Sequence, residues 1–193
     1  MPLIGYCLET TRSVAGIDRV IVSTEDAEIR DVARSFGAEV IDRPLELAED
    51  TVPTLPVLQH TLFVLKTRDG YVPDYVLLLY ATSPLLRAYR IHEAIQLALA
   101  HDADSVVSGT LTRGHYWIEE AGAYRRLYPL SVANRQMTAP LFKENGALYL
   151  SKTAVLEKAI TAPVVVPLIM EEDETIDIDT PADFARVEAR LQS

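Results

Sequence analysis

Residues 17–44 read IDRVIVSTEDAEIRDVARSFGAEVIDRP, and this stretch decides the fold class. Residues 17–24 are rich in β-branched side chains, which favours a strand. The apolar side chains between Ile29 and Phe36 then recur at the three- and four-residue spacing of an amphipathic helix. Gly37 stands where a helix end needs a positive φ. A second strand at residues 38–41 completes a β-α-β unit, whose strands we expect to be parallel.

The same alternation continues along the rest of the chain and predicts an α/β fold. A wholly apolar strand at residues 75–80 predicts burial on both faces. We expect further strands at residues 104–109, 147–151 and 164–170, and helices at residues 56–66, 153–159 and 181–191. Another helix has a predicted buried stripe of Ile91, Ala94, Ile95, Ala98 and Leu99.

Length and charge limit the class of protein. The 193 residues suit one domain, and 49% apolar with 24% charged side chains excludes intrinsic disorder. Eighteen basic against 28 acidic side chains give a net charge of −10, which disfavours a nucleic-acid partner. A small anionic substrate stays compatible with that charge, because a local metal ion can oppose the global field.

The cysteine content and the chain start indicate a location. The single cysteine, Cys7, permits no internal disulfide, which fits a reducing compartment. The opening residues lack a basic region followed by an apolar stretch, and no run reaches the length of a membrane span. We therefore predict a cytoplasmic protein without a membrane partner.

Residues 110–143 interrupt the α/β rhythm. Tyr116, Trp117, Tyr124 and Tyr128 are scattered there among charged residues, which predicts an insertion rather than another β-α unit. Aromatic side chains of this kind can cover a partner subunit.

The segment TIDIDTP at residues 175–181 carries the most specific chemical signal. In an extended backbone Asp177 and Asp179 share one side, so both carboxylates can face one cation. Mg²⁺ suits such a pair, because it takes one or two carboxylates and completes its shell with water and phosphate oxygens. The alternative is structural: Thr180 caps a helix, Pro181 is its first residue, and the upstream acids are merely solvated.

Two other segments offer polar groups. The turn at Thr82 and Ser83 follows a buried strand and can hold a phosphate or a sugar, although Ser83 as a plain helix cap explains it equally well. Arg135 and Gln136, followed by residues 142–149, can grip a carboxylate and hydroxyls, although solvated surface is the commoner role of such residues. Neither a Walker A loop nor a G-x-S-x-G elbow occurs.

Six segments of the chain, taken together, form a recognisable set: PLIGY at 2–6, IVSTED at 21–26, RP at 43–44 with DT at 50–51, TSPL at 82–85, ENGALY at 144–149 and IDIDT at 176–180. In this order they resemble the acylneuraminate cytidylyltransferase family, which makes CMP-sialic acids and related CMP-nonulosonates. The resemblance implies a Rossmann-like, GT-A-like nucleotidyltransferase fold: an α/β three-layer sandwich with a mostly parallel sheet over residues 1–193. It also implies a homodimer with contacts through residues 110–143, and a Mg²⁺-dependent reaction of CTP with a nine-carbon acidic sugar.

The resemblance also implies roles for individual residues. Asp177 and Asp179 match the family's catalytic metal-binding pair, whereas Arg43 and Thr54 match positions near the cytidine. The remaining matches fall in the sugar pocket: Tyr80, Thr82, Ser83, Arg135, Gln136, Lys143 and Asn145.

The sequence departs from the family pattern in three places. Family members begin with a central strand and a Gly-rich triphosphate loop, neither of which is found ahead of residues 2–6. We therefore expect neighbouring strands to lack a partner, so that a longer gene or an outside element completes the sheet. Tyr80 and Leu86 stand where sialic acid enzymes usually carry glutamine and arginine, and Lys143 stands where arginine is commoner.

Two alternatives follow from these departures. One is a catalytically impaired or non-catalytic binding or assembly module that keeps the family scaffold without its triphosphate loop. The other is a related nucleotidyltransferase that uses a different sugar, because pocket residues decide the substrate.

Overall fold

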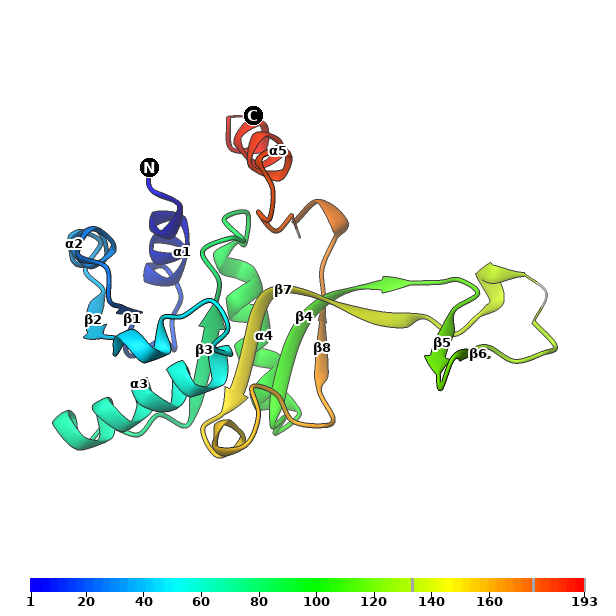
Figure 1. Ribbon diagram of the computed structural model, residues 1–193, viewed down its shortest axis with the longest axis horizontal. Helices are drawn as coiled ribbons and strands as arrows, with labels where there is room; N and C mark the ends of the chain where they lie inside the picture. The colour runs from blue at the N-terminus through cyan, green and yellow to red at the C-terminus, as the bar shows by residue number, and fades with distance from the viewer. Residues whose placement is uncertain (133, 175, 193) are drawn as a thin grey trace.

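The computed structural model describes residues 1–132, 134–174 and 176–192. Figure 1 shows a body of helices and strands at one side, from which a long arm of antiparallel chain projects at the other. The body contains a two-stranded sheet and a four-stranded sheet, and the arm carries a short hairpin.

The two-stranded sheet confirms the β-α-β unit of the opening stretch. β1 (Ile21–Thr24) and β2 (Glu39–Asp42) pair in parallel around α2 (Ala27–Ser35). The Asp26 carboxylate caps the helix by accepting a hydrogen bond from the Ile29 amide at 2.9 Å. β1 is shorter than predicted, and α1 (Leu3–Arg12) precedes it.

The four-stranded sheet has the order β3-β7-β4-β8. β7 pairs antiparallel with both β3 and β4, whereas β4 and β8 are parallel, so β3, β4 and β8 share one direction and β7 opposes them. This arrangement confirms an α/β fold, with a mixed sheet in which β3, β4 and β8 run in one direction. The strands are β3 (Tyr75–Leu79), β4 (Ser105–Thr112), β7 (Leu141–Lys152) and β8 (Val166–Ile169), and the accompanying helices are α3 (Thr54–Asp69) and α4 (Ala88–Ala100).

The main core lies between α4 and the four-stranded sheet. Ile91, Ala94 and Ala98 of α4 are buried there, as the apolar stripe predicts, and Ile95 packs against them. The prediction for Leu99 is wrong, because this side chain is 65% exposed and lines an open groove beside β3.

The strand β3 also differs from expectation. Each of its residues is only partly buried, although its apolar sequence predicts burial on both faces. The reason is topological: β3 is an edge strand that pairs with β7 alone, and β1 likewise pairs with β2 alone, in the described part of the chain. The two sheets are therefore separate within the described residues.

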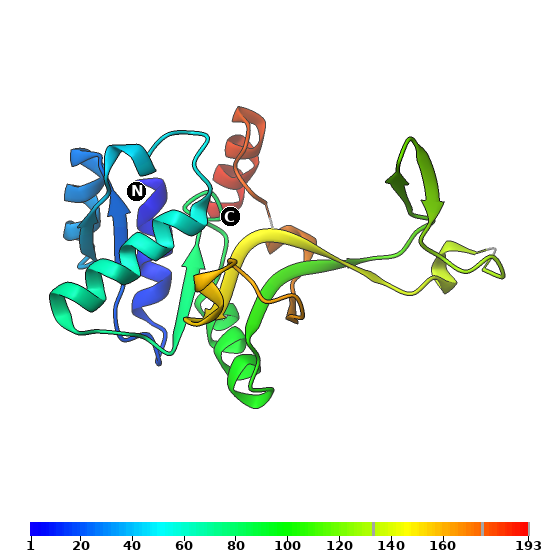
Figure 2. The same ribbon diagram turned by 60° about the horizontal axis from the view of Figure 1, so that its bottom comes forward.

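The arm consists of residues 110–143, and those of them that the structure describes contain no β-α unit, as predicted (Figure 2). β4 and β7 run side by side into its base, and β5 (Trp117–Glu120) and β6 (Ala123–Arg126) form a hairpin beyond it. A register shift between Val107 and Gly109 marks the point where the arm leaves the body. A Cβ atom at Gly109 would lie 2.3 Å from the Lys143 carbonyl oxygen, so the crossing requires glycine.

The C-terminal helix α5 (Pro181–Leu191) has the predicted boundaries and capping box, with Thr180 as the cap and Asp183 at the third position. The described residues also include short 3-10 turns: η1 (Leu45–Leu47), η2 (Arg135–Met137), η3 (Val155–Glu157) and η4 (Glu172–Glu174). The turn η3 replaces the helix predicted at residues 153–159. No helix in the described ranges is long and apolar enough to cross a membrane.

Candidate active site

Tyr80 lies directly after β3 and connects three elements of the candidate site. Its hydroxyl is 3.0 Å from the hydroxyl of Thr54, the first residue of α3. Its carbonyl accepts a hydrogen bond from the Cys7 thiol of α1, with Sγ 3.4 Å from the oxygen. The sequence assigned Thr54 and Tyr80 to separate subsites, and the fold makes them neighbours.

Tyr149 of β7 adds an aromatic wall that sequence reasoning did not assign to the site. Its ring meets the Tyr80 ring edge to face, with centroids 6.3 Å apart. The Tyr149 hydroxyl donates to the Glu144 carboxylate at 3.2 Å. Burial and the negative charge of Glu144 raise the pKa of Tyr149 to about 12, so the phenol stays protonated and donates at neutral pH.

The turn of Thr82 and Ser83 is tied to the acidic segment. The Ile178 amide donates to the Thr82 carbonyl oxygen at 2.9 Å, which holds Asp177 beside the end of β3. Ser83 is 4% exposed, and the prediction of Ser83 as a helix cap is wrong. Ser83 and Leu86 instead belong to a turn in which both side chains are buried, and α4 begins only after Arg87.

Asn145 and Gly146 form the opposite edge of the site. The Asn145 side-chain oxygen accepts hydrogen bonds from the Ser108 hydroxyl at 2.6 Å and from the Ala147 amide at 3.1 Å. Gly146 has a φ of 76°, and a Cβ atom there would lie 3.8 Å from Oδ2 of Asp177. Asn145 thus holds a turn that brings Gly146 against the Asp177 carboxylate.

Asp177 has the chemistry of a cation ligand. Its Oδ1 atom is buried and has no hydrogen-bond partner in the described residues, which is costly for a carboxylate unless a ligand completes it. Asp179, which follows two residues later in the chain, is exposed. Within the described ranges, no three or more His, Cys, Asp or Glu side chains are placed so that they could together hold a metal ion. A hard ion that takes a pair of carboxylates and draws its other ligands from water and phosphate fits this donor set.

Sequence reasoning also missed an ion pair that anchors the acidic segment. Arg90 of α4 donates to Glu174 through Nη2 at 2.5 Å and through Nε at 3.2 Å, and both side chains are 13% exposed. The Tyr89 hydroxyl donates to the same carboxylate. These hydrogen bonds lower the pKa of Glu174 to about 2, and they fix η4 three residues before Asp177. No local pattern signals this ion pair, because the partners are 84 positions apart.

The predicted basic residues do not all reach this place. Arg43 follows β2 and donates to the Ser23 carbonyl oxygen, so it lies at the same end of the groove as Thr54. Lys143 is exposed at the base of the arm, where it pairs with Thr110. Arg135 and Gln136 are exposed and belong to η2. By its colour, this segment lies on the arm and away from the body in both views (Figures 1 and 2). One copy of the chain therefore does not bring these two residues to Asp177.

Solved structures establish the class of fold. The chain superimposes with a TM-score of 0.69 on a CMP:2-keto-3-deoxy-manno-octonic acid synthetase complexed with CTP, at 16% identity over 99% of this chain and 88% of the other. It superimposes equally well on a 4-diphosphocytidyl-2C-methyl-D-erythritol synthase, at 15% identity over 98% and 90% of the two chains. The nucleotidyltransferase fold predicted from the sequence is confirmed.

The family model described as Cytidylyltransferase matches residues 1–161. The chain therefore belongs to the cytidylyltransferase family. It is 27% identical to CMP-N,N'-diacetyllegionaminic acid synthase of Legionella pneumophila, over 99% of this chain and 85% of the relative. It is 26% identical to pseudaminic acid cytidylyltransferase of Campylobacter jejuni, over 96% and 84%. An N-acylneuraminate cytidylyltransferase of Streptococcus agalactiae is 27% identical, over 98% of this chain and 47% of the relative.

Proposed function

We propose that this chain transfers CMP from CTP to a nine-carbon acidic sugar and releases pyrophosphate. Membership of the cytidylyltransferase family supports the nucleotide, and relatives named for legionaminic, pseudaminic and acylneuraminic acids support the sugar class. The observation that carries the proposal is the buried, unpartnered Asp177 oxygen among Tyr80, Tyr149 and Gly146. These matches favour an enzyme over a non-catalytic module.

The reaction is a substitution at phosphorus. The anomeric hydroxyl oxygen of the sugar bonds to the α-phosphorus of CTP, its proton leaves, and the bond to the departing pyrophosphate breaks. Arg43 and Thr54 line the same groove and serve the cytidine side. Tyr80 and Thr82 serve the sugar: the Tyr80 hydroxyl lies 3.0 Å from that of Thr54, and the Thr82 carbonyl oxygen accepts a hydrogen bond from Ile178 of the acidic segment. Catalysis of this kind depends mainly on positioning and electrostatics.

Asp177 and Asp179 would hold the cation. Bound Mg²⁺ would supply positive charge to the phosphate oxygens of the nucleotide. A cation would also offset the local negative charge, because Asp177 and Asp179 follow Glu171 and Glu174 in the same acidic segment of a chain with a net charge of −10. This negative charge repels the phosphates of the nucleotide, and a bound cation would reduce that repulsion.

A homodimer would complete the sugar site. Apolar side chains on the arm are strongly exposed, including Leu130 at 86%, Met137 at 76% and Tyr124 at 69%. Apolar side chains exposed together on one segment often mark an interaction surface. The arm of a second copy would bring Arg135 and Gln136 to the site that one copy leaves without them. The free Cys7 is consistent with a cytoplasmic enzyme.

Pyrophosphate release tests the reaction. The 193-residue chain, and a version that carries any residues encoded upstream of Met1, are assayed with CTP, Mg²⁺ and sialic, legionaminic or pseudaminic acid. We expect release with at least one sugar. Asp177→Asn abolishes it, whereas the matched control Glu171→Gln, an acid in the same segment, retains it. Unchanged turnover in Asp177→Asn overturns the metal assignment, and no release with any sugar overturns the reaction.

Mixing two inactive variants tests the shared site. Asp177→Asn and Gln136→Ala are unfolded together, refolded and assayed. If the arm of one copy serves the site of the other, half of the mixed dimers' sites are intact, and about a quarter of wild-type activity returns. Activity that stays at the level of the separate variants shows that each copy uses its own arm or none.

A further inference from the structure

Arg90 of α4 ties the end of β8 to η4. Its Nη1 atom donates to the carbonyl oxygen of Ile169, the last residue of β8, at 3.3 Å, and to the Glu93 carboxylate at 2.9 Å. Its Nε and Nη2 atoms both donate to Glu174 of η4. Every guanidinium nitrogen therefore has an acceptor, and the side chain is 13% exposed. Arg90 is thus committed to contacts within the protein.

A second tie holds the acidic segment on the other side of Asp177. The Ile178 amide donates to the Thr82 carbonyl oxygen at 2.9 Å. Glu174 precedes Asp177 by three positions and Ile178 follows it directly, so the chain that carries Asp177 is held on both sides. Both ties lead to the stretch of chain that follows β3, which contains the turn at Thr82 and the first residues of α4.

The Asp177 carboxylate depends on such support. Its Oδ1 atom is buried and has no hydrogen-bond partner among the described residues. A carboxylate in that state is more stable when it turns toward water. The ties at Glu174 and Ile178 limit this movement, so they keep the carboxylate in its buried place.

We propose that Arg90 is a positioning residue for the cation site. By holding Glu174 and the end of β8, it keeps Asp177 beside Gly146, where Asp177 would serve as a ligand of Mg²⁺. Arg90 acts through the segment that carries Asp177 and not by contact with the cation. The inference rests on the proposed function, because it takes Asp177 as a metal ligand.

The charge of Arg90 alone predicts the opposite effect on a cation. The change Arg90→Met leaves the Glu174 carboxylate without its positive partner, and this uncompensated negative charge near Asp177 attracts a cation more strongly. Loss of the tie, in contrast, lets the Asp177 carboxylate leave its place and weakens cation binding. The sign of the change in affinity therefore separates the two explanations.

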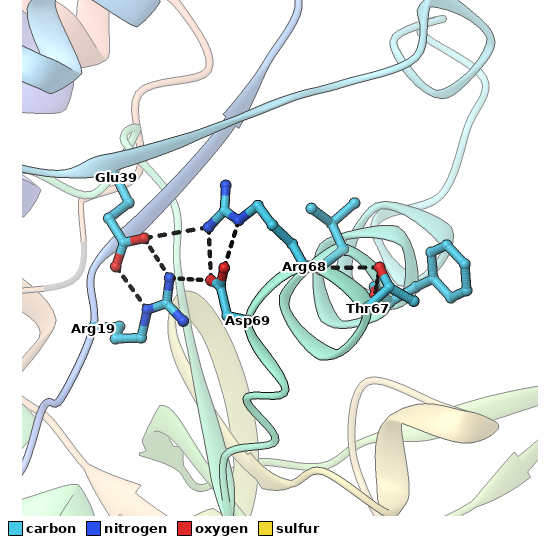
Figure 3. A network of polar contacts seen from close by, with 7 residues as sticks. Arg19, Glu39, Thr67, Arg68 and Asp69 are labelled. Carbon is cyan, nitrogen blue, oxygen red and sulfur yellow. Dashed lines mark hydrogen bonds and ion pairs between the residues drawn. The ribbon is translucent and has the colours of Figure 1, made fainter.

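A second arginine network provides a matched control (Figure 3). Arg19 donates to Glu39 and Asp69, each at 2.7 Å, and its side chain is 19% exposed. Its guanidinium carbon lies 4.8 Å from the centre of the Tyr71 ring, ahead of β3, whereas Asp177 lies beside the end of β3. The change Arg19→Met therefore breaks a comparable network at the opposite end of this strand.

Binding of Mn²⁺ tests the proposal without turnover. Mn²⁺ stands in for Mg²⁺, and its free concentration is read from its electron paramagnetic resonance signal in a titration of the 193-residue chain. We expect Arg90→Met to bind Mn²⁺ at least about tenfold more weakly than the wild type, as is typical when a group that orients a metal ligand is lost. Arg19→Met should bind within about twofold of the wild type, because its network is distant from the site. Equal or tighter binding by Arg90→Met overturns the proposal.

The double variant Arg90→Met, Glu174→Gln separates the tie from the charge and from misfolding. It removes both charges of the pair, so it leaves no unpaired buried charge and keeps the net charge of the segment. We expect it to bind Mn²⁺ at least about tenfold more weakly as well, and an affinity equal to that of the wild type overturns the proposal.

The same titration distinguishes this proposal from the proposed function. If the wild type binds Mn²⁺, Asp177→Asn does not, and both Arg90 variants bind like the wild type, then the role of Arg90 is wrong and the cation site stands. If the wild type binds no Mn²⁺, or Asp177→Asn binds it equally well, then the cation site itself is wrong and the proposal for Arg90 falls with it.

Discussion

Replacing Glu174 by glutamine tests how the segment before Asp177 is held. The carboxylate receives hydrogen bonds from Arg90 and Tyr89 and is 13% exposed, so the change removes a charge-assisted pair from a largely buried place. Glutamine keeps the size and one acceptor oxygen. The effect should therefore report the charge rather than lost packing.

The magnitude follows from the pKa. Folding lowers the pKa of Glu174 from 4.5 to about 2, which corresponds to at most about 3 kcal/mol of stability at neutral pH. Hydrogen bonds to charged groups typically contribute about 1.5 to 3 kcal/mol. We expect Glu174→Gln to lower the free energy of unfolding by about 2 kcal/mol at pH 7.

The pH dependence gives the sharper test. Because the folded-state pKa lies below the unfolded value, the contribution is complete above pH 4.5 and is lost as pH falls toward 2. Urea unfolding of both proteins at pH 7, 4 and 3 should show their difference shrink to less than half at pH 3. The variant Arg90→Met, alone and combined with Glu174→Gln, isolates the coupling between the partners. A difference that is the same at pH 3 and pH 7 refutes the role of the charge.

Three further predictions concern other parts of the chain. Burial raises the pKa of Cys7 to about 11, so its thiol should react slowly with Ellman's reagent at pH 8 and at least about tenfold faster in denaturant; equal rates would contradict its burial. Gly109→Ala should cost about 1 to 3 kcal/mol in urea unfolding, because the new methyl group meets the Lys143 carbonyl, whereas Gly122→Asn should cost less, because the space there is open and asparagine tolerates a positive φ better than most residues. Thr180→Ala should cost about 1 kcal/mol and Thr180→Ser far less, since serine keeps the helix cap; similar losses would show that the hydroxyl is not the cause.

Local signals predicted the elements that depend on neighbours in sequence. Asp26 and Gly37 mark the ends of α2, and the Thr180 capping box sets the start of α5. These signals failed for residues whose burial depends on packing against segments far away in the chain. Ser83 has the sequence of a helix cap, yet the turn buries it, and Leu99 continues an apolar stripe that ends at an open groove.

The candidate site was predicted in part. The sequence assigned Asp177, Tyr80 and Asn145, and the fold places them around the end of β3. It did not assign Tyr149 to the site or the Arg90 anchor, because their roles depend on contacts between residues far apart in the chain. It also grouped Gln136 with the sugar pocket, whereas the arm carries that residue away from the site of its own copy.

The sequence by itself determined the α/β class, the family resemblance and the acidic pair, since periodicity, helix caps and short motifs are properties of neighbouring residues. Only the tertiary structure decided what those pieces form together. It brought Gly146 against Asp177, and it left β1 and β3 as facing edges of one groove. The physical reason is that a backbone hydrogen bond between strands depends on which strands become neighbours in space, and no local pattern specifies that choice.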